Sequence, residues 1–500
     1  MIDPDLTAVR SASRGGAVRA CFVGVGALFA ALALSDPAAG EIQVKERVAL
    51  SMPDEKRTGD LDEMIKRRQI RVLVAWNKTT FSIDKGTPRG LAYDALTAFE
   101  NDLNKRLKTK HLRVHVVFIP TTRQDMFQAL HDGLGDIAAG NLTITEERQK
   151  LVDFSAPSAR AVREIVVTGP ASPSIATVDD LSGKDILVRK SSSYYESLVA
   201  LNARFKQEGK REVKIIPAPE SLEDEDLLEM LNAGLIRLMI VDDHKAEIWA
   251  KVFPKIVLHP DVAVRTGGAI AWALRKNTPQ LKAELDAFIE KNRKGALGAE
   301  LFRRYFKSTK YVKNATSDAE RRKFEQIVEI FRKYGGQYSV DYVLAAAQGY
   351  QESRLDQNAR NPSGAVGVMQ VLPSTGKDLK VGDVAELEPN IHAGVKYIRF
   401  MIDQYYEKEP MTEEDKVLFA FAAYNAGPGR VRQLRRLTKE RGLDENVWFN
   451  NVERIAAEKI GRETVTYVSS IFKYYIAYKL ALEEQAERER ARSEIKPTTQ

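Results

Sequence analysis

The chain has 500 residues, more than one hydrophobic core normally supports, so two or three domains of ordinary size are expected. Hydrophobic residues make up 44% of the sequence and charged residues 29%, which excludes a disordered or membrane-embedded protein. The formal net charge of +7 indicates a polyanionic neighbour, but its sign does not distinguish nucleic acid, anionic lipid and cell wall. Cys21 is the single cysteine, so no intrachain disulfide can form.

The first 40 residues have the pattern of a secretory signal peptide. Three arginines precede a short apolar run, residues 21–34, and small residues follow it up to Gly40. A membrane anchor is the alternative, but the run is shorter than the roughly 20 residues that span a bilayer. We expect cleavage near Gly40 and export to the periplasm. Cys21 stands at the start of the apolar run, which is the wrong side for a lipoprotein cysteine.

Strands and helices alternate between residues 67 and 310, and residues 41–66 are charged, lack a hydrophobic pattern and are expected to form a linker. The expected strands are 70–76, 114–119, 185–189, 213–216 and 238–241, and the expected helices are 90–107, 125–130, 194–207 and 222–232. This alternation predicts βαβ units and a mostly parallel sheet. The region is long enough for two α/β lobes.

Three blocks in this region, residues 135–148, 152–157 and 180–184, resemble in order the motifs of family 3 bacterial extracellular solute-binding proteins. These proteins are the amino-acid receptors of transporters, so the resemblance implies a bilobed, periplasmic-binding-protein-like fold. It also implies that Arg148 clamps a ligand carboxylate and that Asp242 holds a ligand ammonium. A guanidinium fork suits the first role, because it pairs bidentately with a carboxylate.

The rest of the predicted ligand site lies at two turns. Trp76 ends the first strand, and Ser192 and Ser193 precede a helix, where hydroxyl and backbone N–H groups bind anions. The motif usually has an aromatic residue where this chain has Ser158, and the acidic position is doubled as Asp242-Asp243. The ligand therefore stays open between an amino acid and a wall-derived peptide. Arg148 as a surface charge and Asp242 as a helix N-cap are the alternatives.

From residue 318 onward the strand patterns end and helical patterns follow one another to residue 485. The expected helices are 318–334, 341–354, 374–379, 390–406, 413–425 and 462–484. Residues 486–500 form a charged tail without an apolar face, expected to be a frayed helix end or disordered. The complete prediction is a bilobed α/β domain, residues 67–310, followed by a mostly α-helical domain, residues 318–485.

Four blocks of the helical region carry its chemistry: Glu352-Ser353, residues 367–370, residues 423–429 and residues 463–467. In this order they closely resemble the soluble-type lytic transglycosylase domain, a lysozyme-like fold that cuts peptidoglycan. Val368, where leucine is commoner, is the one visible departure. The resemblance implies that Glu352 is the catalytic acid and base. The substrate-binding residues it implies are Ser353, Met369, Gln370, Tyr424, Asn425 and Tyr467.

Each of these residues also has an ordinary structural interpretation. Glu352 alone is a glutamate near a helix end, and Met369 at such spacing is more often core than contact. Gln370 alone is a cap, and the two tyrosines are buried rings with a satisfied hydroxyl. When the four blocks are considered together, these structural interpretations become improbable.

A glycosidase normally uses two carboxylates, and no convincing second one accompanies Glu352. Asp356 lies four residues later, but it precedes a turn where carboxylates bind local backbone N–H groups. Glu463 begins a helix and is suited to capping it. A single carboxylate suffices if the muramoyl C6 hydroxyl is the nucleophile, since Glu352 then serves first as acid and afterwards as base.

The sequence thus predicts a peptidoglycan lytic transglycosylase that leaves 1,6-anhydro-N-acetylmuramoyl ends. A hydrolytic muramidase on the same fold and a wall-anchored solute receptor or sensor are the alternatives. We expect glycan strands as the partner, with no nucleic acid. We also expect a periplasmic location, with peripheral association with the outer membrane as a further expectation. No cofactor or metal is required, and the six histidines show no ligand spacing.

Overall fold

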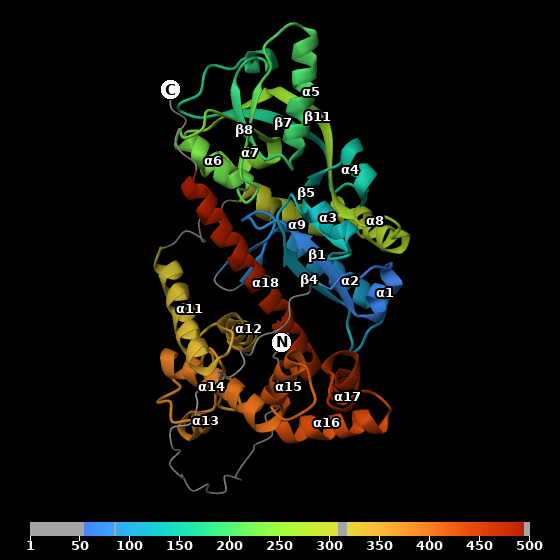
Figure 1. The fold of residues 1–500 in the computed structure, drawn as a ribbon, viewed down its shortest axis with the longest axis vertical. Coiled ribbons are helices and arrows are strands. Elements are labelled where there is room, and N and C mark those ends of the chain that lie inside the picture. The colour runs from blue at the N-terminus through green and yellow to red at the C-terminus, as the bar shows by residue number, and fades with distance from the viewer. Residues whose placement is uncertain (1–54, 85–86, 309–317, 495–500) are drawn as a thin grey trace, which may run out of the picture.

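A computed structural model describes residues 55–84, 87–308 and 318–494. The predicted signal peptide, most of the 41–66 linker and the end of the charged tail lie outside these residues. An α/β region, blue to yellow in Figure 1, is followed by a helical region, orange to red, at the other end of the molecule. The predicted fold class is therefore confirmed. Among the described helices, none combines the length and the apolar character needed to span a bilayer.

The first lobe is built on three parallel strands. β1 (Gln69–Val74) lies between β4 (His115–Pro120) and β5 (Ile137–Thr143) and pairs in parallel with both. The β1 residues from Ile70 to Val74 are all buried, as expected for a strand covered on both faces. The remaining elements of this lobe are β2 (Ser82–Asp84), β3 (Thr87–Arg89), α1 (Leu61–Lys66), α2 (Leu91–Arg106), α3 (Met126–His131), α4 (Glu146–Leu151), β6 (Asp153–Phe154) and α8 (Pro279–Arg293).

The folded part of this lobe begins before residue 67, the expected start of the domain. Leu61 and Met64 of α1 are buried in the lobe's hydrophobic core. The carboxylate of Asp60 accepts hydrogen bonds from the backbone N–H groups of Leu61, Gln280 and Leu281. Residues 55–66, expected as part of a linker, therefore pack on the lobe. The sequence did not indicate this because the segment has only three apolar residues among many charged ones.

Two antiparallel strands connect the lobes. β11 (Val257–Leu274) pairs with β7 (Ala159–Thr168) along its first part and with β5 along its last part. The order β10-β7-β11-β5-β1-β4 makes this sheet mixed, so the prediction of a mostly parallel sheet is wrong. The 18-residue β11 was missed because four register shifts interrupt its pairing with β7, and these break the alternation of polar and apolar residues.

The second lobe has its own hydrophobic core around residues such as Leu198, Phe205 and Ile240. A parallel pair, β8 (Asp185–Val188) and β9 (Lys214–Pro217), lies near β10 (Leu238–Asp242), which pairs with β7. The helices are η1 (Val178–Leu181), α5 (Ser193–Gln207), α6 (Asp224–Asn232) and α7 (Asp243–Trp249). Helix α9 (Ala296–Phe302) then packs on α2 and α8, and the π-helical turn η2 (Arg303–Lys307) contacts α7 before the chain leaves the domain.

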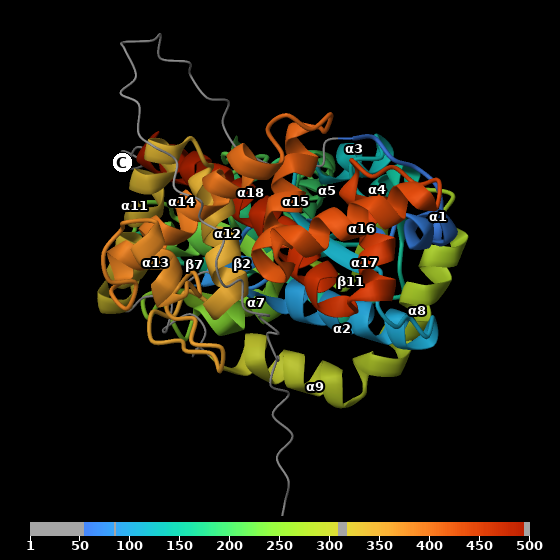
Figure 2. The same ribbon diagram turned by 90° about the horizontal axis from the view of Figure 1, so that it is seen from below.

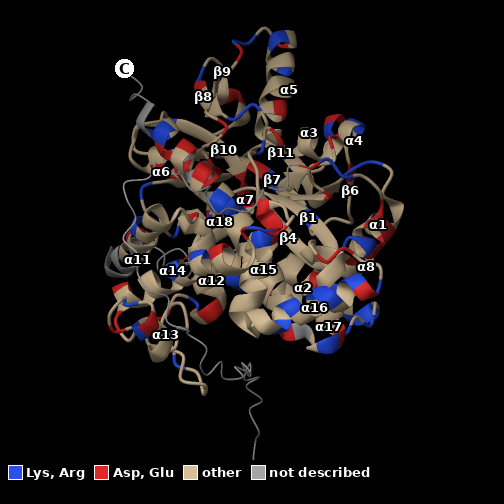
Figure 3. Ribbon diagram, turned by 60° about the horizontal axis from the view of Figure 1, so that its bottom comes forward, with Lys and Arg blue, Asp and Glu red and all other residues tan. Residues whose placement is uncertain are grey.

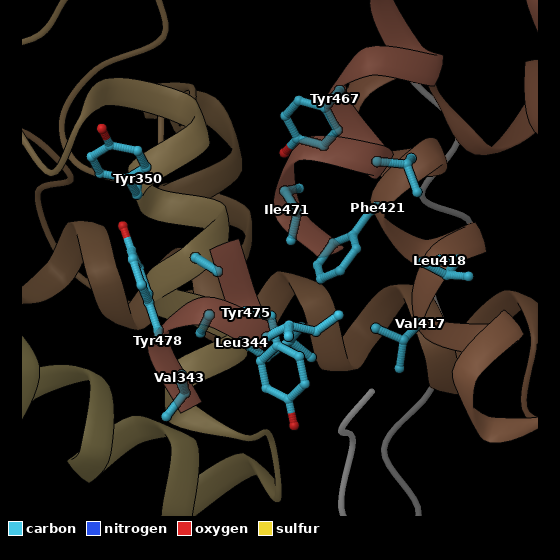
Figure 4. Packing of buried hydrophobic residues seen from close by; sticks show 14 of the residues in the cluster. Val343, Leu344, Tyr350, Val417, Leu418, Phe421, Tyr467, Ile471, Tyr475 and Tyr478 are labelled. Atoms are coloured by element: carbon cyan, nitrogen blue, oxygen red, sulfur yellow. The ribbon is translucent and has the colours of Figure 1, made fainter. Parts of the chain in front are cut away.

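The described part of residues 318–494 is helical apart from isolated bridges around residues 360–371. Its elements are α11 (Asp318–Tyr338), α12 (Tyr342–Ser353), α13 (Pro373–Asp378), α14 (Leu387–Tyr405), α15 (Glu413–Ala426), α16 (Pro428–Glu440), η3 (Trp448–Val452), α17 (Glu453–Lys459) and α18 (Arg462–Glu494). Helices α12, α15 and α18 meet in one apolar core, where Leu344, Phe421 and Ile471 pack together (Figure 4).

Helix α18 connects the two domains. Its first half packs on α12 and α15, and the helix also contacts β4 of the first lobe. It then runs past the α/β region, as Figure 1 shows in red and Figure 2 shows from below. Its far end reaches the second lobe, where Ala491 joins the apolar core and Arg492 pairs with Glu229 of α6. The described part of the charged tail, residues 486–494, is thus a docked helix, because its charges find partners on the other domain.

Candidate active site

Glu352 lies in the last turn of α12. Asp341 caps the start of this helix by accepting a hydrogen bond from the backbone N–H of Val343 at 2.9 Å. The helix ends where Arg354 and Leu355 both adopt left-handed backbone with φ of 61° and 64°, which turns the chain sharply away. The Arg354 guanidinium covers the ring of Tyr350, 4.5 Å from its centroid, which fixes this unusual exit. Glu352 is thereby held at the end of a rigid element.

No cation among the described residues stands beside the carboxyl group of Glu352 to balance a negative charge. Burial raises its pKa to about 8, and the only opposing influence is the hydroxyl of Tyr467, which donates a hydrogen bond to Oε1. The residue keeps partial access to solvent. A glutamic acid that is protonated at neutral pH and still reachable can donate its proton to a substrate oxygen.

Two buried tyrosines surround this carboxyl group. Tyr467 of α18 also accepts a hydrogen bond from Nε2 of Gln348, at 3.1 Å. Tyr424 of α15 donates to the backbone carbonyl of Met369 at 2.8 Å. Burial raises the pKa of both phenols well above the usual range, and the nearby Glu352 adds to the shift. Both therefore stay protonated and act as hydrogen-bond donors, one to the acid itself and one to the neighbouring turn.

The turn after α12 is held by side-chain amides. The carbonyl oxygen of Asn390 accepts from Met369 N–H at 2.8 Å, and its amide donates to the carbonyls of Val366 and Val384. Gly367 has φ of 77°, and an added Cβ there would lie 2.4 Å from the Asn390 amide. The glycine is required both by its backbone conformation and by this close approach.

The predicted substrate-binding residues differ in how far their side chains are exposed. The side chain of Met369 is fully buried and packs against the glycines of α12 and α14, which leaves no side-chain surface for a substrate. Gln370 is nearly buried and donates to the carbonyl of Gly367 at 2.8 Å. Ser353 donates to the carbonyl of Val368 at 2.8 Å, and Asn425 accepts from the hydroxyl of Thr464 at 2.7 Å.

Three supporting residues were not identified from the sequence: Gln348, Asn390 and Thr464. Each is a polar side chain with less than a tenth of its surface exposed, on a helix whose pattern is otherwise apolar. A polar residue on a buried helix face is the signal that could have found them, since it must be hydrogen-bonded there. Asp356, in contrast, accepts from the backbone N–H of Asn358 at 2.9 Å, the local role expected for it.

Four of the five residues predicted to bind a ligand in the α/β domain gather between its lobes. Arg148, Ser192, Ser193 and Asp242 line a space of only about 20 Å³. Arg148 donates to the Glu196 carboxylate at 3.0 Å and to the carbonyls of Thr143 and Ser191. Asp242 accepts from Asn141 at 2.8 Å and lies 3.3 Å from the Lys245 ammonium. The two groups predicted to meet a ligand carboxylate and ammonium are therefore already paired with the protein's own side chains.

The lobes are joined by further ion pairs beside this space. Arg123 of the first lobe pairs at 2.8 Å with Glu223 of the second, and Asn77 donates to the same carboxylate at 3.0 Å. Trp76, the fifth predicted residue, packs edge-on against Phe81. It does not line the small space. A larger cavity of about 570 Å³ lies next to these pairs, between α2, α7 and the segment α9–η2, and includes Trp249 and Phe306.

Two family models match this chain, one for each domain. The transglycosylase SLT domain matches residues 329–447, and the bacterial extracellular solute-binding proteins, family 3, match residues 70–308. Both predicted resemblances are therefore confirmed, in the predicted order. The matched residues include Glu352 and Tyr424 in one domain and Arg148 and Asp242 in the other.

Curated relatives are similar along most of the chain. A protein named membrane-bound lytic murein transglycosylase F from Desulfosudis oleivorans is 28% identical over 431 residues, which cover 81% of this chain and 89% of that protein. The proteins of the same name from Ectopseudomonas mendocina and Actinobacillus succinogenes are 27% and 29% identical and cover 84% and 80% of this chain. They are covered over 86% and 82% of their own length.

Solved structures of amino-acid-binding proteins resemble part of the chain. An ancestral arginine-binding protein bound to arginine has a TM-score of 0.40 and 23% identity, and covers 48% of this chain and 98% of its own. A putative binding component of an ABC transporter from Wolinella succinogenes, complexed with lysine, has a TM-score of 0.40 and 18% identity. It covers 49% of this chain and 99% of its own.

Proposed function

We propose that this chain, which joins a family 3 solute-binding domain to a transglycosylase SLT domain and resembles membrane-bound lytic murein transglycosylase F, cleaves peptidoglycan non-hydrolytically. The SLT domain and the curated relatives support the enzyme class, a lytic murein transglycosylase. The bond cleaved is the β-1,4 linkage between N-acetylmuramic acid and N-acetylglucosamine. The products carry 1,6-anhydro-N-acetylmuramoyl ends.

One observation carries this proposal: burial and a single phenol are the two influences on the pKa of Glu352, and no carboxylate contributes. A retaining or inverting hydrolase needs a second carboxylate, within about 5–10 Å of the first. The carboxylate of Asp356 accepts a hydrogen bond from the backbone N–H of Asn358 in its own turn. A reaction with one carboxyl group therefore requires that the substrate itself supplies the nucleophile.

The proposed reaction has two steps at the same carboxyl group. Protonated Glu352 donates its proton to the glycosidic oxygen, the bond from the anomeric carbon breaks, and the N-acetylglucosamine side leaves with a hydroxyl. The carboxylate that results then removes the proton of the muramoyl C6 hydroxyl, whose oxygen bonds to the anomeric carbon. Glu352 ends protonated, and no water is consumed. General acid–base help of this kind contributes about 10²–10⁴ in rate.

Tyr467 has a defined part in this cycle. Its hydroxyl donates to Oε1 of Glu352, and this bond becomes stronger when the carboxyl group ionises between the steps. Gln348 keeps the phenol oriented by donating to its oxygen. Ser353, Gln370, Tyr424 and Asn425 form and brace the walls beside the acid, and we retain them as the proposed substrate-binding set.

We propose that the α/β domain regulates this activity by binding an amino acid or a wall-derived peptide between its lobes, at Arg148, Ser192, Ser193 and Asp242. The ion pairs Arg123–Glu223 and Arg148–Glu196 join the lobes and support a closed domain. A ligand must open this domain or displace Glu196 from Arg148. Helix α18 supports communication, since it carries Tyr467 near one end and meets the second lobe at the other.

We propose a periplasmic location, with a cleaved leader and peripheral attachment to the outer membrane, and domain limits of 67–310 and 318–485. Residues 55–66 and 486–494 lie outside these limits and pack on the α/β domain, the former with α1 in the core of its first lobe.

Borohydride treatment of digested peptidoglycan tests the proposed reaction. Hydrolysis leaves a reducing muramic acid end that borohydride converts to the alcohol, whereas an anhydro end has no free aldehyde and is unchanged. We expect the muropeptides to be resistant to reduction. Reducible muramic acid ends from the wild-type enzyme, absent with Glu352→Gln, would instead favour a muramidase. A protein that releases no muropeptides would favour the receptor alternative.

A further inference from the structure

A pocket of about 310 Å³ lies between the two domains, away from Glu352 and from the space between the lobes. One wall comes from the first lobe, at the start of β1 and β4, and includes Arg71 and His115. The opposite wall comes from the helical domain and includes Phe449 of η3 and Ser469 and Lys473 of α18. The volume is within the range of small-ligand sites.

Positive charge dominates the lining. Five permanent cations face the pocket, and two carboxylates, Glu55 and Glu414, share the wall. The cations are Arg57, Arg67, Arg68, Arg71 and Lys473. Three further carboxylates lie outside the lining and hold these cations in place: Asp136 pairs with Arg67 and Arg71, Glu453 with Arg68, and Glu100 with Lys473. The groups that an incoming molecule meets therefore favour an anion. Figure 3 shows blue and red segments meeting where α18 passes β4.

Two hydrogen-bond donors of this wall have no partner among the residues that the structure describes. The hydroxyl of Ser469, a residue with only 4% of its surface exposed, makes no hydrogen bond, and neither does Nη1 of Arg68. Buried donors are paired in the great majority of cases, and an unpaired one costs about 1–3 kcal/mol. Ser469 and Arg68 come from different domains, so one acceptor-rich ligand can satisfy both.

Arg68 is constrained to this position. It has left-handed backbone with φ of 57°, directly before β1, and its guanidinium donates to the side chains of Asn450 and Glu453 across the domain boundary. Asn450 has φ of 62°. Two residues without the freedom of glycine thus hold an unusual backbone at the same interdomain contact, which is typical of a site that must be preorganised.

We propose that this pocket binds a small oxyanion bearing a phosphoryl group, which bridges Arg68 of the α/β domain and Ser469 of the helical domain. Phosphoryl oxygens match a wall of guanidinium donors better than a single carboxylate does, because they offer acceptors in several directions. The bound anion clamps α18 against β1 and β4. A soluble phosphorylated compound and an anionic lipid headgroup share this chemistry.

Pyrophosphate is the probe that tests the site, titrated calorimetrically into the full-length protein. We expect saturable binding with one site, weakened about tenfold in Ser469→Ala and in Arg57→Gln, since each removes one donor from the wall. Arg57 is partly exposed, its ion pair is with exposed Glu55 and its other side-chain contact is a long hydrogen bond to Gln69, so its substitution should leave the fold intact. Arg441→Gln is the matched control, because the Arg441 side chain is similarly exposed, pairs with Glu458, and neither residue lines the pocket.

His115 provides a local readout of the same titration. Burial holds its pKa below the usual value, and the ring lines the pocket. A bound anion stabilises the imidazolium, so the pKa followed by NMR should rise as pyrophosphate saturates the protein, and should rise less in Ser469→Ala at the same concentration. Absence of saturable binding, or equal weakening in Arg441→Gln, would overturn the proposal.

Vesicles containing phosphatidylglycerol distinguish the two sources of the phosphoryl group. Sedimentation with vesicles that pyrophosphate reverses, and that Ser469→Ala loses, identifies a lipid headgroup as the ligand. Saturable pyrophosphate binding without such sedimentation identifies a soluble compound. Peptidoglycan cleavage by Arg57→Gln should equal that of the wild type, which separates this site from the reaction at Glu352.

Discussion

Glu352 in the helical domain and Asp224 in the α/β domain are both carboxyl groups withdrawn from water, and they differ in what surrounds them. Asp224 pairs with Arg189 and with Lys245 at 2.7 Å, and these cations hold its pKa well below the usual range. Glu352 meets a phenol and no cation, and its pKa is raised to about 8. Withdrawal from water therefore accompanies an ion pair in one domain and a neutral acid in the other.

The same contrast separates the two sites as a whole. Between the lobes, every charge expected to meet a ligand already has a partner within the protein, as Arg148 has in Glu196. At Glu352, the group expected to react is left without a counter-charge. A binding site can be closed by its own side chains and reopened by a ligand, whereas an acid catalyst must keep its proton available. The predictions below test this difference.

The largest expected effect is the loss of cleavage in Glu352→Gln, by about 10²–10⁴ or more, because the amide can neither donate nor accept the proton. Release of soluble muropeptides from purified peptidoglycan measures it. Asp356→Asn is the matched control, since this carboxylate lies four residues away and serves its own turn. Near-normal activity in Glu352→Gln would refute the catalytic assignment.

The same variant should be more stable than the wild type. A carboxyl group whose pKa is 4.5 unfolded and about 8 folded makes the wild type lose stability as pH rises through that window. Glutamine has no proton to lose, so Glu352→Gln should gain about 3 kcal/mol at pH 7 relative to the wild type. Urea unfolding at pH 4 and pH 7 measures the difference, which should nearly vanish at pH 4. A gain independent of pH would contradict the raised pKa.

The pH dependence of cleavage should show one ionisation on its alkaline side. Above pH about 8 the fraction of protonated Glu352 falls tenfold per pH unit, and kcat/KM should fall in the same proportion. A profile that is flat from pH 7 to pH 10 would mean that another group donates the proton.

Tyr467→Phe should slow cleavage about tenfold, because the carboxylate formed between the two steps loses a charge-assisted hydrogen bond. The same change removes the influence that lowers the pKa of Glu352, so the alkaline limb should move to higher pH. Tyr474→Phe is the control on the same helix, since its hydroxyl meets only Arg354. Equal pH profiles in both variants would show that Tyr467 has a merely structural role.

The smallest expected effect lies between the lobes. Glu196→Gln removes the carboxylate that competes for Arg148, so the affinity for an amino acid or wall peptide should increase a few-fold. Calorimetry with a panel of such ligands measures it, and Glu208→Gln, an exposed change on the turn after α5, is the control. Unchanged or weaker binding would show that Glu196 is part of the ligand site.

The sequence predicted those parts of the molecule in which local pattern and packing agree. The helices around Glu352 follow from apolar spacing, and the four motif blocks bring Glu352, Tyr424 and Tyr467 together. It did not predict β11, whose register shifts disturb its alternation, or the docking of residues 486–494, whose partners Asp226 and Glu229 lie over 250 positions away. Nor did it predict the ion pair between Glu196 and Arg148, because that contact depends on how far the lobes close.

Cleavage in water enriched in ¹⁸O tests the central claim most directly. If Glu352 acts alone and the C6 hydroxyl closes the ring, the muramoyl ends form without water, and their mass spectra should show no incorporated label. Hydrolysis would place one ¹⁸O atom at the new anomeric position of each product. Unlabelled anhydro ends from the wild type, absent with Glu352→Gln, are the predicted result, and labelled reducing ends would contradict it.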